Sequence, residues 1–379
     1  MEVPFFRHKL SSANADSIAN VLDTPFLTSG SVGRAVEQQL CEYFNVSAAL
    51  LTNSWTNGAV ATLLALGLKP GDEVIVPAMT FIATANVVEL LGGKVIFVDV
   101  DPVTLLITPE RIEAAITNKT RVVIPVHLYG QMCDMKAIQA VVAKHANIAI
   151  IEDCAHCFEG QRKNYRPGAY SDAAIFSFYA TKNITCGEGG AIITRNQELA
   201  KNLAKTRLHG MSAGAVDRFK KGAYRHWDMD CLGVKANLPD LLAALLPDQI
   251  TTIEATLADR TRLANNYRKA FADLPIRVQG LAEDVVSAEH IFPIHVKPDV
   301  RDETINVLNS NGVQVAVNYR SVPTLTYYQE RYNHQDSDFP VSSDWGHGTL
   351  SLPFYPDMPD NEQQYVIETV KRVVVPICE

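Results

Sequence analysis

Short apolar runs alternate with helical patterns through the first half of the chain. Runs of the length of a buried strand occur at 48–52, 73–76, 94–98, 122–126, 147–151, 173–176 and 191–194. Such runs are typical of strands that are buried on both faces, and strands that alternate with helices build a parallel sheet. The alternation therefore predicts an α/β fold with a mostly parallel sheet.

A single lysine follows one of these runs. The stretch 173–190 reads AAIFSFYATKNITCGEGG, and Lys182 is its only cation, placed where the strand should end. A lysine beside a buried strand either extends its ammonium group to solvent or has a lowered pKa and takes part in chemistry. The stretch by itself leaves both interpretations open.

An acid follows a second run. The run at 147–151 continues into Glu152 and Asp153, and ligands bind open α/β sheets at the carboxyl ends of their strands. Lys182 and Asp153 at two such ends are the pair that a pyridoxal 5′-phosphate (PLP) enzyme needs. The lysine bonds the cofactor, and the carboxylate keeps its ring nitrogen protonated.

The motifs FSFYATKN, GEGG and, upstream, EDCAH resemble those of the DegT-type sugar aminotransferases, a PLP-dependent family with the aspartate aminotransferase fold. The resemblance covers nearly the whole chain. It implies a fold-type I PLP-dependent transferase, α/β in class, whose large PLP-binding domain (1–250) holds a mostly parallel seven-stranded sheet. Residues 251–379 would form a smaller C-terminal α/β domain.

The resemblance also implies roles around the cofactor ring. Lys182 would hold the cofactor and move the proton, Asp153 would pair with the ring nitrogen, and His156 would lie against the ring or its O3′. Phe81 falls where the family places an aromatic residue that stacks on the ring. Without the resemblance, Phe81 at a helix start would be read as a core residue.

The cofactor phosphate is expected at the start of a helix. A strand, a small polar turn and a helix follow one another at 48–66, which offers N–H groups to a phosphate. The resemblance implies that Thr56, Asn57, Ser177 and, from the partner subunit, Lys235 bind it. That contact would require a homodimer with shared active sites, although Lys235 also fits an exposed loop. Trp55 departs from the family pattern.

Composition excludes other classes of protein. A net charge of −8 argues against a general nucleic-acid binder. The sequence contains no run of 18 apolar residues, so no membrane span is expected. The N-terminus lacks the apolar core of a signal peptide, so the cytoplasm is the expected location. Cys154 and Cys157 form a C-x-x-C motif, but no second one accompanies it, which disfavours a redox or metal site.

The resemblance implies an aminotransferase that uses L-glutamate and an oxo-sugar in surface polysaccharide or lipopolysaccharide biosynthesis. The acceptor would be a nucleotide-linked keto-sugar or an 8-oxo octulosonate-type sugar acid. The alternatives are a PLP-dependent sugar dehydratase, a non-catalytic PLP-binding regulator and a Schiff-base aldolase without cofactor. Dehydratases of the family replace the lysine by histidine, which Lys182 argues against.

Three features lie in the second half of the chain. A helical pattern at 241–267 predicts one long helix that links the two domains. The segment 212–230 has no clear period and predicts a surface loop near the substrate entrance. Asn318 and Tyr319 stand where the family often has a histidine-tyrosine pair, so the acceptor pocket is harder to infer.

Overall fold

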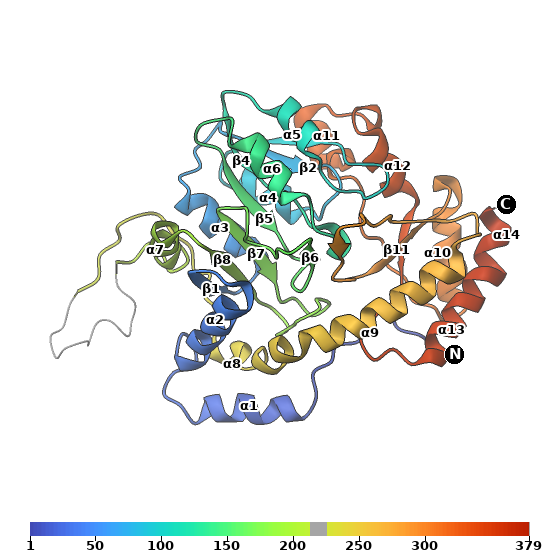
Figure 1. Ribbon diagram of the computed structural model, residues 1–379, viewed down its shortest axis with the longest axis horizontal. Coiled ribbons are helices and arrows are strands. Elements are labelled where there is room, and N and C mark those ends of the chain that lie inside the picture. The colour runs from blue at the N-terminus through green and yellow to red at the C-terminus, as the bar shows by residue number, and fades with distance from the viewer. Residues whose placement is uncertain (213–225, 379) are drawn as a thin grey trace.

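The computed structural model describes residues 1–212 and 226–378, and a seven-stranded sheet forms its centre (Figure 1). The strand order is β1-β8-β7-β5-β4-β2-β3. Strand β8 is antiparallel to both of its neighbours, and the pairs from β7 to β3 are parallel, which confirms the predicted class. The strands are β1 (Ala48–Thr52), β2 (Glu73–Pro77), β3 (Lys94–Val98), β4 (Thr120–Val123), β5 (Ala149–Asp153), β7 (Ala173–Ser177) and β8 (Gly190–Thr194).

Helices cover both faces of the sheet, because successive strand residues point to opposite sides. In β2, Val74 and Val76 pack with helices α3, α4 and α7, whereas Ile75 packs with α5 and α6. Helix α2 covers the second face over β1, β8 and β7. The helices are α2 (Ser31–Phe44), α3 (Trp55–Ala65), α4 (Ala83–Leu90), α5 (Pro109–Ala115), α6 (Met135–Val142) and α7 (Gln197–Thr206).

The single helix predicted at 241–267 is wrong in one respect. The structure has a short α8 (Asp240–Ala243) and then a 25-residue α9 (Pro247–Phe271). Pro247 has no N–H group to continue the hydrogen bonds of α8 and stands in the first turn of α9, where none is needed, so it begins a new helix. Helix α9 runs from the sheet to the C-terminal part of the molecule (Figure 1).

The C-terminal part contains a three-stranded antiparallel sheet of order β12-β11-β9. A two-stranded ribbon, β10 with β6, joins it to the loop after β5. The remaining α-helices and strands are α1 (Ala13–Leu22), β6 (Gln161–Arg162), β9 (Arg277–Val278), β10 (Val285–Val286), β11 (Phe292–His295), α10 (Arg301–Ser310), α11 (Thr326–Tyr332), α12 (Pro340–Gly348), β12 (Thr349–Leu352), α13 (Asp360–Thr369) and α14 (Val375–Cys378).

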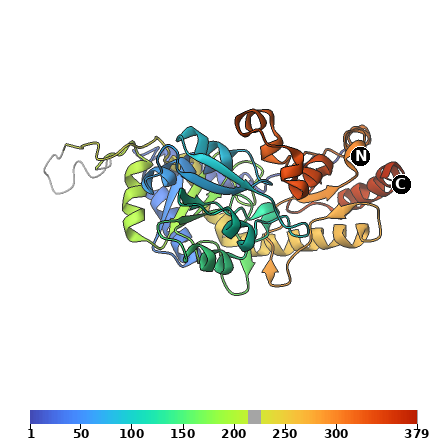
Figure 2. The same cartoon turned by 90° about the horizontal axis from the view of Figure 1, so that it is seen from above.

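Both ends of the chain lie in this C-terminal part (Figures 1 and 2). The N–H of Val3 donates to the carbonyl of Gly312 at 2.8 Å, and the N–H of Gln314 donates to the carbonyl of Val3 at 3.1 Å. Helix α9 crosses the predicted boundary at 250/251, so the two-domain division stays a prediction. Most of the predicted loop at 212–230 lies outside the described residues. Among the residues that the structure describes, no helix is long and apolar enough to cross a membrane.

Candidate active site

Lys182 and Asp153 come together at one edge of the sheet. Asp153 is the last residue of β5 and Ser177 the last of β7, and these strands are parallel neighbours. Lys182 lies in the turn after β7, where its N–H donates to the carbonyl of Tyr179 at 2.9 Å. Burial lowers the pKa of Lys182 to about 8, although the negative charge of Asp153 raises it. A lysine with this pKa is partly neutral near pH 8, and the neutral amine is nucleophilic.

The Asp153 carboxylate is held from two sides. It is 4% exposed and accepts hydrogen bonds from Thr84 Oγ1 at 2.8 Å and from the N–H of Ala155 at 3.1 Å. Burial raises the pKa of Asp153, while these two hydrogen bonds and the charge of Lys182 lower it. A cationic ring nitrogen placed beside the carboxylate would favour its ionised form.

His156 lies between two tyrosines. Its Nδ1 accepts the N–H of Tyr129 at 3.2 Å, so the neutral ring carries its proton on Nε2, which lies 3.0 Å from the hydroxyl of Tyr319. Burial and the charge of Lys182 keep the pKa of His156 well below its usual value. The hydroxyl of Tyr319 accepts a hydrogen bond from this N–H and keeps its own hydrogen for another acceptor. The rings of His156 and Tyr319 are within 12° of parallel.

Phe81 lies at the open side of this group. Its side chain is 51% exposed, and its ring centroid is 5.6 Å from that of Tyr319. Phe81 precedes α4, whose first turn supplies Thr84 to Asp153. An exposed aromatic ring beside Tyr319 is available to stack on a flat ligand.

The predicted phosphate site is the N-terminus of α3. Ser54 caps this helix, because its Oγ accepts the N–H of Asn57 at 3.0 Å. The N–H groups of Trp55 and Thr56 have no partner within the helix, as in the first turn of any α-helix. The indole of Trp55 is buried in the core cluster of α3, so this departure from the family pattern leaves the helix terminus open.

Gly190 brings Ser177 close to this helix terminus. It is the sheet partner of both Thr52 in β1 and Ser177 in β7. A side chain at Gly190 would place Cβ 2.6 Å from the carbonyl oxygen of Phe176 and 2.9 Å from the carbonyl carbon of Ser54, so glycine is required here. The Oγ of Ser177 accepts the N–H of Tyr179 at 3.3 Å.

Lys235 lies beside the same helix terminus of its own chain. Its carbonyl accepts from Asn53 Nδ2 at 3.2 Å, and its exposed side chain donates to Asn237 Oδ1. Asn53 in turn accepts from Asn57 Nδ2 at 2.9 Å. The structure describes one chain, so the role of Lys235 in a partner's site stays a prediction.

The structure adds residues that the sequence interpretation did not assign. They are Thr84, Tyr129, Tyr319 and His290, whose ring centroid is 4.5 Å from that of His156. Two signals were available in the sequence. Tyr129 follows a strand run, and Tyr319 stands where the family has the tyrosine of its histidine-tyrosine pair. Cys154 and Cys157 are buried free thiols in the described structure, and burial raises their pKa values well above normal, which disfavours thiolate chemistry.

Comparisons with known proteins agree with this geometry. The model of the DegT/DnrJ/EryC1/StrS aminotransferase family matches residues 9–371. Spr1654 from Streptococcus pneumoniae, assigned as a sugar aminotransferase, is similar in its PLP form, with 27% identity, 100% of both chains covered and a TM-score of 0.92. Its PMP form is 28% identical over 98% of this chain and 99% of that chain, also with a TM-score of 0.92.

A third solved structure is that of DesV from S. venezuelae, in complex with a ketimine intermediate. It is 29% identical, covers 98% of each chain and has a TM-score of 0.89. The family match and these structures extend over nearly the whole chain. The chain therefore belongs to the DegT/DnrJ/EryC1/StrS aminotransferase family of PLP-dependent enzymes.

Proposed function

We propose that this enzyme transfers an amino group from L-glutamate to an oxo-sugar. The acceptor would be a nucleotide-linked keto-sugar or an 8-oxo octulosonate-type sugar acid, in surface polysaccharide or lipopolysaccharide biosynthesis. The observation that carries the proposal is the pair of Lys182 and Asp153 after adjacent parallel strands, with the pKa of the lysine lowered to about 8. Membership of the aminotransferase family supports the reaction class.

The residues present fit PLP. An amine of lowered pKa, a buried carboxylate and the N-terminus of an 11-residue helix lie at one edge of the sheet. They match the aldehyde, the ring nitrogen and the phosphate of the cofactor, respectively. Bound PLP supplies a conjugated ring that accepts the electrons of a deprotonated substrate carbon.

The chain's own residues then have distinct tasks. Lys182 Nζ would hold the cofactor and, once free, would move the proton at the reacting carbon. Asp153, held by Thr84 and Ala155, keeps a positive charge on the ring nitrogen. Phe81 and His156 would flank the ring, and Thr56, Asn57 and Ser177 would bind the phosphate.

The test is a visible absorption spectrum with PLP, followed by amino transfer to a panel of oxo-sugars. We expect visible absorbance and an aminated product that depends on L-glutamate, with one acceptor class preferred. Absence of visible absorbance would indicate the cofactor-free aldolase. Loss of a sugar hydroxyl without amination would indicate the dehydratase, and PLP binding without turnover would indicate the regulator.

Lys235 tests the proposed homodimer. If its ammonium reaches the phosphate in the partner's site, Lys235→Ala should weaken PLP binding by about 1.5–3 kcal/mol, the usual range for a hydrogen bond to a charged group. The fold should persist, because the side chain is exposed. The measurement is PLP affinity by titration of the apo protein, with Lys201→Ala as an exposed-lysine control.

Mixing Lys235→Ala chains with Lys182→Ala chains distinguishes the partner's site from the chain's own site. In the shared arrangement, one site of each heterodimer carries both changes and the other is native, so activity should partly return. If Lys235 serves its own chain, every site carries one change and no activity is recovered. That result, with subunit exchange demonstrated, would rule out the shared site.

A cytoplasmic location is part of the proposal, with no membrane or nucleic-acid partner. Fractionation of cells that produce the full-length protein should place it with cytoplasmic markers. Recovery with membranes or in an exported fraction would contradict this location.

A further inference from the structure

A buried carboxylate beside the Lys182 segment has no role in the tasks above. Glu159 lies in the loop after β5, three residues beyond His156, and its side chain is 0% exposed. In the described part of the chain, no donor reaches its Oε2 and no basic side chain forms an ion pair with it. Burying a carboxylate is costly unless it is paired or hydrogen-bonded, so the hydrogen bond that it does make matters.

That remaining contact leads to the residue next to Lys182. Glu159 Oε1 accepts from Asn183 Nδ2 at 2.6 Å, and Asn183 Nδ2 also donates to the carbonyl of Ala288 at 2.8 Å. Both amide protons are therefore used, and the oxygen of Asn183 faces His290 Nδ1 at 3.0 Å. Because this oxygen is an acceptor, His290 must carry a proton on Nδ1.

His290 connects this chain of hydrogen bonds to the candidate active site. Its ring centroid is 4.5 Å from that of His156, with an angle of 31° between the two planes. His156 in turn bonds the hydroxyl of Tyr319. Contacts therefore run from Glu159 through Asn183 and His290 to the ring that lies beside Lys182.

We propose that Glu159 is a positioning residue for amino transfer, which acts through Asn183 to hold His290 in its Nδ1–H form and the His156 ring in place. The peptide bond between Lys182 and Asn183 means that the same contact restrains the Lys182 backbone. The proposal rests on the aminotransferase activity and does not depend on which sugar is the acceptor. Glu159 itself touches no reacting atom.

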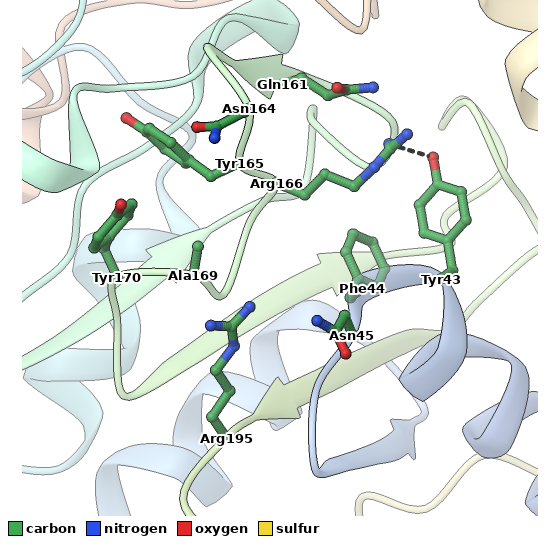
Figure 3. Close-up of a pocket in the computed structure, with 10 residues that line it drawn as sticks. All are labelled: Tyr43, Phe44, Asn45, Gln161, Asn164, Tyr165, Arg166, Ala169, Tyr170 and Arg195. Carbon is green, nitrogen blue, oxygen red and sulfur yellow. Dashed lines mark hydrogen bonds between the residues drawn. The ribbon is translucent and has the colours of Figure 1, made fainter.

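The surroundings of Glu159 make this role depend on pH. Burial raises the pKa of Glu159 to about 7, the Asn183 hydrogen bond and Arg260 of α9 lower it, and Glu254 of α9 raises it. Tyr43 of α2 and Cys157 in the same loop are its other titratable neighbours. Arg166 fixes the backbone, because its Nη1 donates to the carbonyl of Glu159 at 3.1 Å. The same nitrogen donates to the Tyr43 hydroxyl at 2.6 Å, as Figure 3 shows by a dashed line.

The hydrogen bond from Asn183 to Glu159 is stronger at high pH than at low pH. Above pH 7 Glu159 is ionised and accepts a charge-assisted hydrogen bond from Asn183, so the chain of contacts is tight. Below pH 7 it is protonated and accepts more weakly. His290 and His156 stay neutral through this range, because burial holds both pKa values well below normal.

The experiment is nitrogen NMR of the apo protein with ¹⁵N-labelled histidine, titrated across pH 7, with His290→Asn to assign the resonance. We expect the Nδ1 resonance of His290 to shift with a midpoint near 7. Glu159→Gln keeps the acceptor oxygen but cannot titrate, so His290 should remain Nδ1–H without that shift. Glu159→Ala should give a mixture of tautomers at every pH.

Glu289→Gln is the matched control. Glu289 is also buried, precedes His290 and has its pKa raised by burial, but it bonds Arg268 Nη2 at 2.9 Å and does not contact Asn183. Its variant should keep the wild-type titration. A midpoint near 7 that persists in Glu159→Gln, or disappears in Glu289→Gln, would overturn the proposal.

Amino transfer by the PLP-loaded enzyme gives a second readout. Glu159→Ala should lower kcat about tenfold, as expected for one hydrogen bond, with little change in KM. Glu159→Gln should keep the wild-type kcat above pH 7 and show no loss attributable to residue 159 below it. An unchanged kcat in Glu159→Ala, or an acid loss retained in Glu159→Gln, would contradict a positioning role.

Discussion

Lys182→Ala should reduce amino transfer by about 10⁴-fold or more, the upper range for loss of a general acid–base group. The variant also loses the amine that bonds the cofactor, so both cofactor attachment and proton transfer are impaired. The measurement is borohydride reduction of the PLP-loaded protein followed by peptide mapping. The wild-type protein should carry its label on Lys182, and Lys182→Ala should carry none.

Lys201→Ala is the control for this prediction, because Lys201 is an exposed lysine on α7 that pairs with Glu198. It should be labelled on Lys182 and remain active. A stable label on any other lysine would show that Lys182 is not the residue that bonds the cofactor.

The pH dependence of PLP capture gives a further check. Because burial lowers the pKa of Lys182 to about 8, PLP capture by the apo protein should accelerate as pH rises through 8 and then level off.

Asp153→Asn should slow amino transfer on the order of 10³-fold, as for loss of a preorganised charged partner. A neutral amide cannot hold a positive charge on the ring nitrogen, so the ring becomes a weaker electron acceptor. The fold should persist, because the asparagine oxygen can accept from the N–H of Ala155 while its NH2 group donates to the hydroxyl of Thr84. PLP affinity and single-turnover amino transfer would separate binding from chemistry.

Thr84→Val is the matched comparison for Asp153→Asn. It removes the 2.8 Å hydrogen bond to the carboxylate but leaves the charge, so the rate should fall by only about tenfold. Normal transamination by Asp153→Asn would show that Asp153 is not the partner of the ring nitrogen. An equal loss in both variants would show that orientation, and not charge, is the contribution of Asp153.

Much of the sheet could be predicted because its strands are buried on both faces. Continuous apolar runs marked β1 at 48–52 and β3 at 94–98 with the bounds that the structure shows. The run predicted at 122–126 became β4 (Thr120–Val123), since Pro125 has no N–H group to donate to a neighbouring strand. Lys182 and Asp153 could be brought together for a related reason, because carboxyl ends of adjacent parallel strands share one edge.

The surroundings of this pair depended on tertiary structure. Tyr319 and His290 lie more than 100 positions along the chain from His156, and the periodicity of a local segment contains no signal for such a contact. The same holds for Asn183 between Glu159 and His290, since each side chain comes from a different loop. The sequence by itself determined the α/β sheet and the position of Lys182 and Asp153 at its strand ends. Packing of the C-terminal part against that edge decided which rings and hydrogen bonds surround Lys182, because only folding brings groups distant in sequence within bonding distance.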